Sequence, residues 1–264
     1  MSGNPDVLFV TLDSCRYDAF ATAEAPNLKA IGPLVRAYSP SHFTYGAHAA
    51  FFMGFTPGDP TRPEPYVNSK YAKIFRMAGG GHRGFVAPWL ELDGRNLVDG
   101  FRRRGYRTIG TGAVGWFDPA TDTGRMLTAD FERFHYAGGP HFRAQREFLV
   151  AEIGKARSAG VPVFVFANLG ETHVPYWHEG ATWSDAVNPC VPFGTTNDAA
   201  ESRRRQTACI EWIDAEIAPL LGAFMSAGIV VCSDHGDCWG EDGLWEHGIH
   251  HPRTLEVPLI FRLP

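Results

Sequence analysis

The sequence lacks the cysteine pattern of a disulfide or zinc-thiolate framework. Its 264 residues include five cysteines, an odd number, and these are scattered without a CxxC pair. Isolated free thiols of this kind are typical of proteins in a reducing compartment. We therefore expect a cytoplasmic protein.

The sequence also lacks the features of a secreted or membrane protein. Residues 1–12 carry no basic segment, and no apolar run reaches the ~18 residues that a membrane helix needs. The net charge of −5 is mixed in sign and gives no broad basic field, so neither nucleic acid nor an anionic membrane is expected as a partner. Two arginine triplets, at 102–104 and 203–205, are local exceptions that we interpret as solvated helix faces.

What the sequence does contain is an alternation of short apolar runs with helical patterns. The chain is long enough for one large α/β domain or two small ones, and we expect a single domain over residues 1–264. Strands are predicted at 6–12, 106–111, 161–169, 229–233 and 256–261. Helices are predicted within 24–40 and 68–77 and at 44–54, 96–104, 141–158 and 198–226, the last broken or offset near Pro219. This order predicts a mainly parallel central sheet with helices on both faces.

Three of the predicted strands end in side chains that suit a metal site. The first strand stops at Asp13, the strand at 161–169 leads into Glu171 and His173, and the strand before Ser233 leads into Asp234 and His235. Ligands of an open parallel sheet gather beyond the carboxyl ends of its strands. These carboxylates and imidazoles are therefore expected at one edge of the sheet.

A loop rich in histidine follows the Asp-His pair. His247, His250 and His251 lie in a stretch that also holds several Gly, Asp and Trp residues. This density of imidazoles suggests a bound metal or anion. Taken alone, however, an Asp-His pair and its neighbours are better explained as a hydrogen-bonded loop with surface histidines.

A hydroxyl group is expected near the same edge. Thr44 is predicted as the N-cap of a helix that ends at Gly54, and a helix start favours an anion or alkoxide. His48 lies four residues on, on the same helix face, and could contact the same ligand. In isolation, a simple cap and a partly buried histidine are the better interpretation.

Taken together, these segments resemble the alkaline phosphatase superfamily, and within it the sulfatase-like hydrolases. The resemblance follows the same order along almost the whole chain. The matching segments are VLFVTLDSCRYDAF with Asp13, residues 41–57 with Thr44 in the nucleophile position, GYRTIGTG at 105–112, ETHVPY at 171–176, SDHGDCWGEDGLWEHG at 233–248 and LEVPLIF at 255–261.

The chain departs from the sulfatase pattern at several points. Thr44 stands where sulfatases need a Cys or Ser for conversion to formylglycine, Ser14 replaces the second of their paired aspartates, and residues 113–115 replace a Lys-Trp-His segment. The chain also ends just after the closing strand, so we expect a short form without the C-terminal subdomain of many sulfatases. Threonine nucleophiles occur in relatives that cleave or transfer phosphodiesters.

The resemblance thus implies a metal-dependent hydrolase or transferase that acts on a phosphodiester, phosphomonoester or phosphonate ester. The expected partner is a small-molecule phosphoric ester or related anion, and no oligomeric state is predicted. Two alternatives remain open. One is a metal-binding biosynthetic enzyme or binding protein with non-hydrolytic chemistry, and the other is a sulfuric ester hydrolase.

The resemblance also implies a ligand set for a metal ion. Asp13, Thr44, Asp234 and His235 would hold it, and their mixture of oxygen and nitrogen donors suits Zn or Mn better than Mg or Ca. We expect one ion. A second remains possible, with candidate ligands among Glu171, His173, His247, His250 and His251.

The remaining roles belong to the nucleophile and the histidines. Thr44 would attack as a covalent nucleophile, activated by the ion. His173 and His247 would act in catalysis and bind the substrate, and His48 would also bind the substrate. The long connection at 56–100 is the expected source of substrate selection, but its sequence names no substrate.

Overall fold

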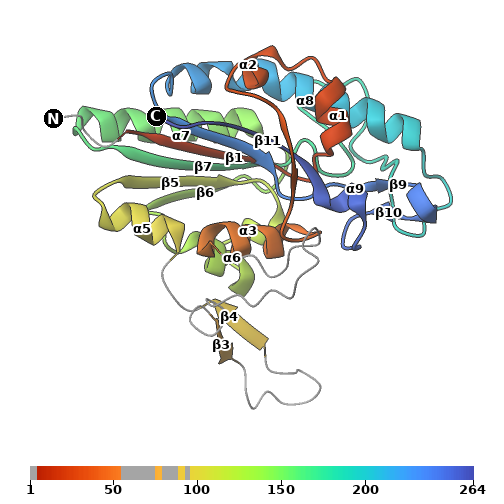
Figure 1. The fold of residues 1–264 in the computed structure, drawn as a ribbon, viewed down its shortest axis with the longest axis horizontal. Coiled ribbons are helices and arrows are strands. Elements are labelled where there is room, and N and C mark those ends of the chain that lie inside the picture. Colours follow the sequence, from red (N-terminus) through yellow and green to blue (C-terminus); the bar gives the residue numbers. More distant parts are fainter. Residues whose placement is uncertain (1–4, 55–74, 79–88, 93–95) are drawn as a thin grey trace.

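The computed structural model describes residues 5–54, 75–78, 89–92 and 96–264 (Figure 1). Its centre is a seven-stranded sheet in the order β2-β11-β8-β1-β7-β5-β6. The five strands from β8 to β6 run parallel, whereas β11 and β2 add antiparallel pairs at one edge. The predicted mainly parallel α/β sheet is therefore confirmed. The strands are β1 (Val7–Leu12), β2 (Val35–Tyr38), β5 (Arg107–Gly112), β6 (Arg133–Tyr136), β7 (Val163–Leu169), β8 (Gly228–Ser233) and β11 (Glu256–Arg262).

Helices cover both faces of the sheet (Figure 1). One face carries α1 (Tyr17–Thr22), α2 (Pro26–Lys29), α7 (Phe142–Ser158) and α8 (Ala199–Gly222), and the other carries α3 (Thr44–Met53), α5 (Leu97–Arg103) and α6 (Asp122–Thr128). Smaller elements complete the described chain: hairpin strands β3 (Phe75–Ala78) and β4 (Trp89–Leu92), strands β9 (Cys238–Trp239) and β10 (Trp245–Glu246), helix α9 (Pro252–Leu255), and the 3₁₀ turns η1 (Gly115–Phe117) and η2 (Glu241–Gly243).

Strand β7 is an inner strand of the sheet, between β1 and β5, and is buried along its whole length. Its alternate side chains enter two different cores. Val163 and Val165 pack toward α7 and α8, whereas Phe164 and Phe166 join an aromatic cluster beneath α3, α5 and α6. Burial on both faces explains why this strand reads as an unbroken apolar run in the sequence.

Two predicted helices differ from the structure in detail, one at its first residue and the other at an internal proline. The residue preceding α3 is Phe43, so Thr44 is the first helical residue and not the N-cap. Helix α8 continues through Pro219 without a break. Its apolar face, including Ile213 and Ile217, is fully buried, and that packing compensates for the hydrogen bond that proline removes.

Two segments predicted as helical are partly strands. Residues 24–40 contain the short helix α2 but also the strand β2. The residues of β2 are mostly exposed, so they lack the alternation of buried and exposed side chains by which a strand is recognised in a sequence. Of the helix predicted at 68–77, residues 75–77 belong to β3. The rest lies outside the described residues, as does most of the loop at 56–100.

All five cysteines are free, as their scattered spacing predicted, and all five are buried. Among the helices of the described residues, none is both long and apolar enough to cross a membrane.

Glycines in β5 make room for the aromatic cluster. A Cβ atom added at Gly112 would lie 2.3 Å from Cβ of Phe117, and one added at Gly110 would lie 2.7 Å from a ring carbon of Phe134. No side chain fits at these positions without moving the rings. The close packing of η1 and β6 against β5 thus depends on glycine.

We predict that Gly112→Ala lowers the free energy of unfolding by about 1–3 kcal/mol, because the added methyl overpacks the aromatic cluster. Urea unfolding monitored by circular dichroism measures this. Gly154→Ala is the matched control, since Gly154 is exposed in α7 with nothing near its added Cβ, and alanine favours a helix. An unchanged midpoint for Gly112→Ala would contradict the prediction.

Candidate metal centre and active site

The candidate metal centre begins where β1 and β8 end side by side. Leu12 pairs with Ser233 in the parallel register, so the next residues, Asp13 and Asp234, leave the sheet at the same edge. His235 follows directly. All three side chains are fully buried, and one potential ligand atom from each lies within 4.8 Å of the others.

Thr44 reaches the same point from the start of α3. Its Oγ1 lies 3.5 Å from Oδ1 of Asp13 and 3.2 Å from Nε2 of His235. The side chain is almost completely buried. The four predicted ligands, which come from three separate parts of the sequence, therefore converge on one small volume.

The electrostatics of this centre fit a divalent cation. Burial and the neighbouring carboxylate raise the pKa of Asp13, and burial raises the pKa of Asp234 to about 6. Oδ2 of Asp234 is buried without a hydrogen-bond partner. A cation would neutralise the two carboxylates and provide the missing partner. Burial also lowers the pKa of His235 to about 4, which leaves the neutral imidazole that metals require.

Other groups hold the two carboxylates in position. Nδ2 of Asn168 in β7 donates to Oδ2 of Asp13 at 3.0 Å. The backbone N–H groups of Ser14 and His235 donate to Oδ1 of Asp234 at 3.1 and 2.9 Å. Sequence reasoning missed Asn168. The observation that could have revealed it is an amide side chain inside an otherwise apolar strand. A buried amide needs a hydrogen-bond partner, so its presence there indicates a polar neighbour.

His48 lies beneath Thr44, inside the protein. Burial lowers its pKa to about 3, so the ring is neutral. Its Nδ1 lies 2.8 Å from the carbonyl oxygen of Thr44 and therefore donates, which leaves Nε2 to accept from the Thr11 hydroxyl at 2.9 Å. The rings of Phe117 and Phe166 meet it edge-on. The substrate contact predicted for His48 stays a prediction, and here both ring nitrogens are bonded to the protein.

His173 and His247 lie beside the metal centre. The ring centroid of His247 is 4.4 Å from that of His235 and 5.1 Å from that of His173. Nδ1 of His173 is bonded to the carbonyl oxygen of Val174 at 2.8 Å. The structure thus brings both predicted histidines to the site.

The charge of His247 is controlled by Asp237. Burial would lower the pKa of His247, but its hydrogen bond to Asp237, 2.8 Å long, and the charge of that carboxylate raise the pKa to about 9. The other oxygen of Asp237 accepts from the Tyr176 hydroxyl at 2.7 Å. His247 is therefore a cation at neutral pH in the absence of metal.

Sequence reasoning missed Asp237 and Tyr176. The signals were an aspartate two residues after the Asp-His pair and the tyrosine that closes the segment at 171–176. Asp237, with His235 and His247, forms a second group whose potential ligand atoms lie within 4.8 Å of one another. This second group shares His235 with the first.

Arg16, also missed, ties the loops of the site together. Its side chain is 1% exposed and forms ion pairs of 2.8 Å with Asp18 and 2.7 Å with Glu241. It also donates to the backbone oxygen of Asp237 at 3.2 Å and covers the face of Trp239. The loop after β1 and the segment after β8 are thereby joined.

The other candidates for a second metal lie elsewhere. Glu171 accepts from the backbone N–H of Phe142 at the start of α7, and burial raises its pKa to about 7. His251 caps α9, and His250 is exposed. None of these three side chains belongs to a metal-type group within the described part of the chain.

Several solved structures share this fold although their sequence identity to the chain is low. Phosphonate monoester hydrolase of Agrobacterium radiobacter matches with a TM-score of 0.65 at 16% identity, over 99% of this chain and 68% of that one. The C-terminal periplasmic domain of EcEptC from Escherichia coli, in complex with Zn, matches with a TM-score of 0.61 at 14% identity. The match covers 99% of this chain and 74% of that one. No family model matches the sequence, and no curated protein is significantly similar to it.

A third solved structure with a similar fold is described as a member of the alkaline phosphatase superfamily. It is a protein from Vibrio parahaemolyticus, with a TM-score of 0.55 and 12% identity, over 99% of this chain and 60% of that one. At these identities the likeness concerns the fold. The chain has an α/β fold like that of alkaline phosphatase superfamily structures.

Proposed function

We propose that this protein is a metal-dependent enzyme that hydrolyses or transfers a phosphoric ester group, with Thr44 as its covalent nucleophile. The observation that carries the proposal is the position of the Thr44 hydroxyl. It lies at the first residue of α3 and within 3.5 Å of both Asp13 and His235. The name of the structural neighbour from Agrobacterium, a phosphonate monoester hydrolase, supports the same class of chemistry.

Asp13, Thr44, Asp234 and His235 would hold the ion. The donor set suits Zn or Mn, and the zinc complex of a structural neighbour favours zinc. When bound, the ion lowers the pKa of the Thr44 hydroxyl and neutralises charge on a phosphoryl oxygen. The same site could accept a sulfuric ester, which makes the choice between phosphate and sulfate part of the test.

The chain's own residues supply the remaining chemistry. The Thr44 oxygen attacks phosphorus, and the bond to the alcohol of the ester breaks. His247, oriented by its hydrogen bond to Asp237, binds a phosphoryl oxygen or, in its protonated form, gives its proton to the departing alcohol. His173 lies beside it and binds a second oxygen. Water, or an acceptor alcohol in a transferase, then attacks phosphorus and releases Thr44.

Three further expectations belong to this proposal. The substrate is a small molecule and not a nucleic acid or a membrane, and residues 1–264 form a single catalytic domain. The protein acts in the cytoplasm, in keeping with its five free cysteines. The EcEptC structure is a periplasmic domain, so fractionation of cells is the direct check of location.

We predict that Thr44→Ala lowers turnover at least about a thousandfold, because it removes the attacking oxygen. Turnover is measured on a panel of phosphate monoesters and diesters, phosphonate esters and sulfate esters, with and without chelator. Thr44→Ser keeps a hydroxyl and should retain part of the activity. Thr123→Ala, in the exposed first turn of α6, is the control for a threonine outside the site.

Full, chelator-sensitive activity in Thr44→Ala would refute the covalent role of Thr44. No turnover across the whole panel by wild-type protein with tightly bound metal would instead favour a binding protein or a non-hydrolytic enzyme. The two results are distinct, because the first concerns the nucleophile and the second concerns the reaction.

We predict one tightly bound ion per chain. Elemental analysis of protein purified without chelators should give one equivalent, which Asp234→Asn loses because a carboxylate ligand becomes an amide. His247→Ala should retain the ion, since His247 is bonded to Asp237. Two equivalents in the wild type, falling to one in His173→Ala or His247→Ala, would show a binuclear site in which the second group of ligands is used.

A further inference from the structure

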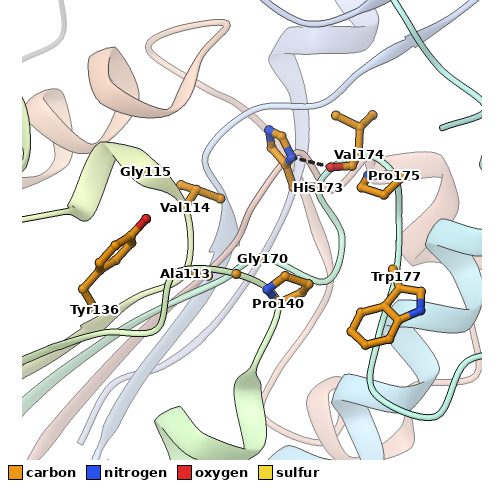
Figure 2. A pocket seen from close by; sticks show the side chains of 12 residues that line it. Ala113, Val114, Gly115, Tyr136, Pro140, Gly170, His173, Val174, Pro175 and Trp177 are labelled. Carbon is orange, nitrogen blue, oxygen red and sulfur yellow. Dashed lines mark hydrogen bonds between the residues drawn. The ribbon is translucent and has the colours of Figure 1, made fainter. Parts of the chain in front are cut away.

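A hollow of about 260 Å³ opens next to the candidate active site. Its walls come from the loop after β5, the end of β6 with the glycine-rich turn that follows, and the loop after β7. Figure 2 shows Tyr136 and Trp177 on opposite sides of it, with Pro140 and His173 between them. Among the residues that the structure describes, no carboxylate, guanidinium or ammonium group lines this hollow.

His173 connects the hollow to the catalytic groups. It belongs to the lining, and its ring is 5.1 Å from that of His247. Its backbone N–H donates to the carbonyl oxygen of Gly170, another lining residue. A ligand whose phosphoryl oxygens meet His173 and His247 could therefore extend directly into the hollow.

A second connection leads to the nucleophile. Trp116 follows the lining residue Gly115, and its ring centroid lies 6.1 Å from that of Phe43 and 5.6 Å from that of Tyr45. These two aromatic residues flank Thr44 in the chain. The wall of the hollow is thus packed against the start of α3.

The lining is suited to a flat, uncharged group. Tyr136 and Trp177 offer aromatic surface, Pro140 and Pro175 offer apolar surface, and the glycines leave space where side chains would otherwise stand. An aromatic ring buried among such groups gains both from apolar area and from ring packing. A cationic amino alcohol would lose hydration on entry, and the described residues of the lining include no carboxylate to compensate for that loss.

We propose that this hollow binds an uncharged aryl group, or a similarly flat apolar group, of the ester on which the enzyme acts. The inference rests on the proposed function, because it requires an anion site at His173 and His247. The hydroxyl of Tyr136 adds one hydrogen-bonding group for a polar substituent on the ring. Substrates with an aryl group are thereby selected over those with a charged amino alcohol.

Binding of simple anions to zinc-loaded protein tests this by titration calorimetry. The probes are inorganic phosphate, methylphosphonate, phenylphosphonate and 2-aminoethylphosphonate. Phenylphosphonate should bind at least about tenfold more tightly than methylphosphonate. The aminoethyl compound should show no such gain. These comparisons use wild-type protein and depend on no variant.

A variant that fills the hollow provides the second measurement. In the described part of the chain, the atom nearest to a Cβ added at Gly115 is the Tyr136 hydroxyl oxygen, 4.0 Å away, so the backbone can carry a side chain that occupies the cavity. Gly115→Leu should reduce the preference for phenylphosphonate over methylphosphonate to about twofold or less. Gly154→Leu, on the exposed side of α7, is the matched control and should keep the preference.

The possible failures can be told apart. If phosphate binds but methyl- and phenylphosphonate bind equally well, the assignment of the hollow is wrong while the anion site stands. If the aminoethyl compound binds more tightly than the phenyl compound, the predicted selectivity is wrong. If inorganic phosphate itself does not bind, both the proposed function and this inference are overturned.

Discussion

The structure depends on two carboxylates that are buried next to each other. Asp13 and Asp234 have no exposed surface, and the basic groups of the described residues that lie within ion-pair distance of them are the imidazoles of His48 and His235. Burial lowers the pKa of both histidines far below neutrality, so neither brings a positive charge. Such an arrangement costs folding energy unless a cation is bound, and this imbalance is the physical basis for proposing a metal centre here.

The other residues of the site hold these side chains in position through hydrogen bonds. Asn168 and the loop amides fix the carboxylates, while His48 links the first residue of α3 to Thr11 of β1. The hydroxyl of Thr44 is thereby held relative to the sheet and not only to its own helix. On the other side, Asp237 orients His247 and is itself held through Tyr176. Orientation by fully bonded neighbours is what a preorganised site requires.

The sequence predicted the convergence of these side chains because each of them follows its strand directly in the chain. A buried run followed at once by Asp13, or by Asp234 and His235, can be recognised without a structure, since the ends of parallel strands share an edge. Asn168 could not be recognised, because its role depends on the neighbouring strands of the sheet. For His48, periodicity gave the correct helix, but whether its ring faces the ligand or the core depends on Thr11, which lies far away in sequence. The exposed edge strand β2 has no pattern of its own and is defined only by its pairing with β11.

The amide of Asn168 has a consequence for how such a protein can change over evolution. Its nitrogen donates to Asp13, and its oxygen accepts from the backbone N–H of Ala113 at 3.3 Å, so a single side chain connects Asp13, a candidate metal ligand, to the wall of the hollow. Ala113 also packs against Gly170, where an added Cβ would come within 2.8 Å. A mutation that moves this wall therefore also shifts the carboxylate of Asp13. Diversification of specificity is easier at positions of the wall without this connection, such as Trp177, than at Ala113.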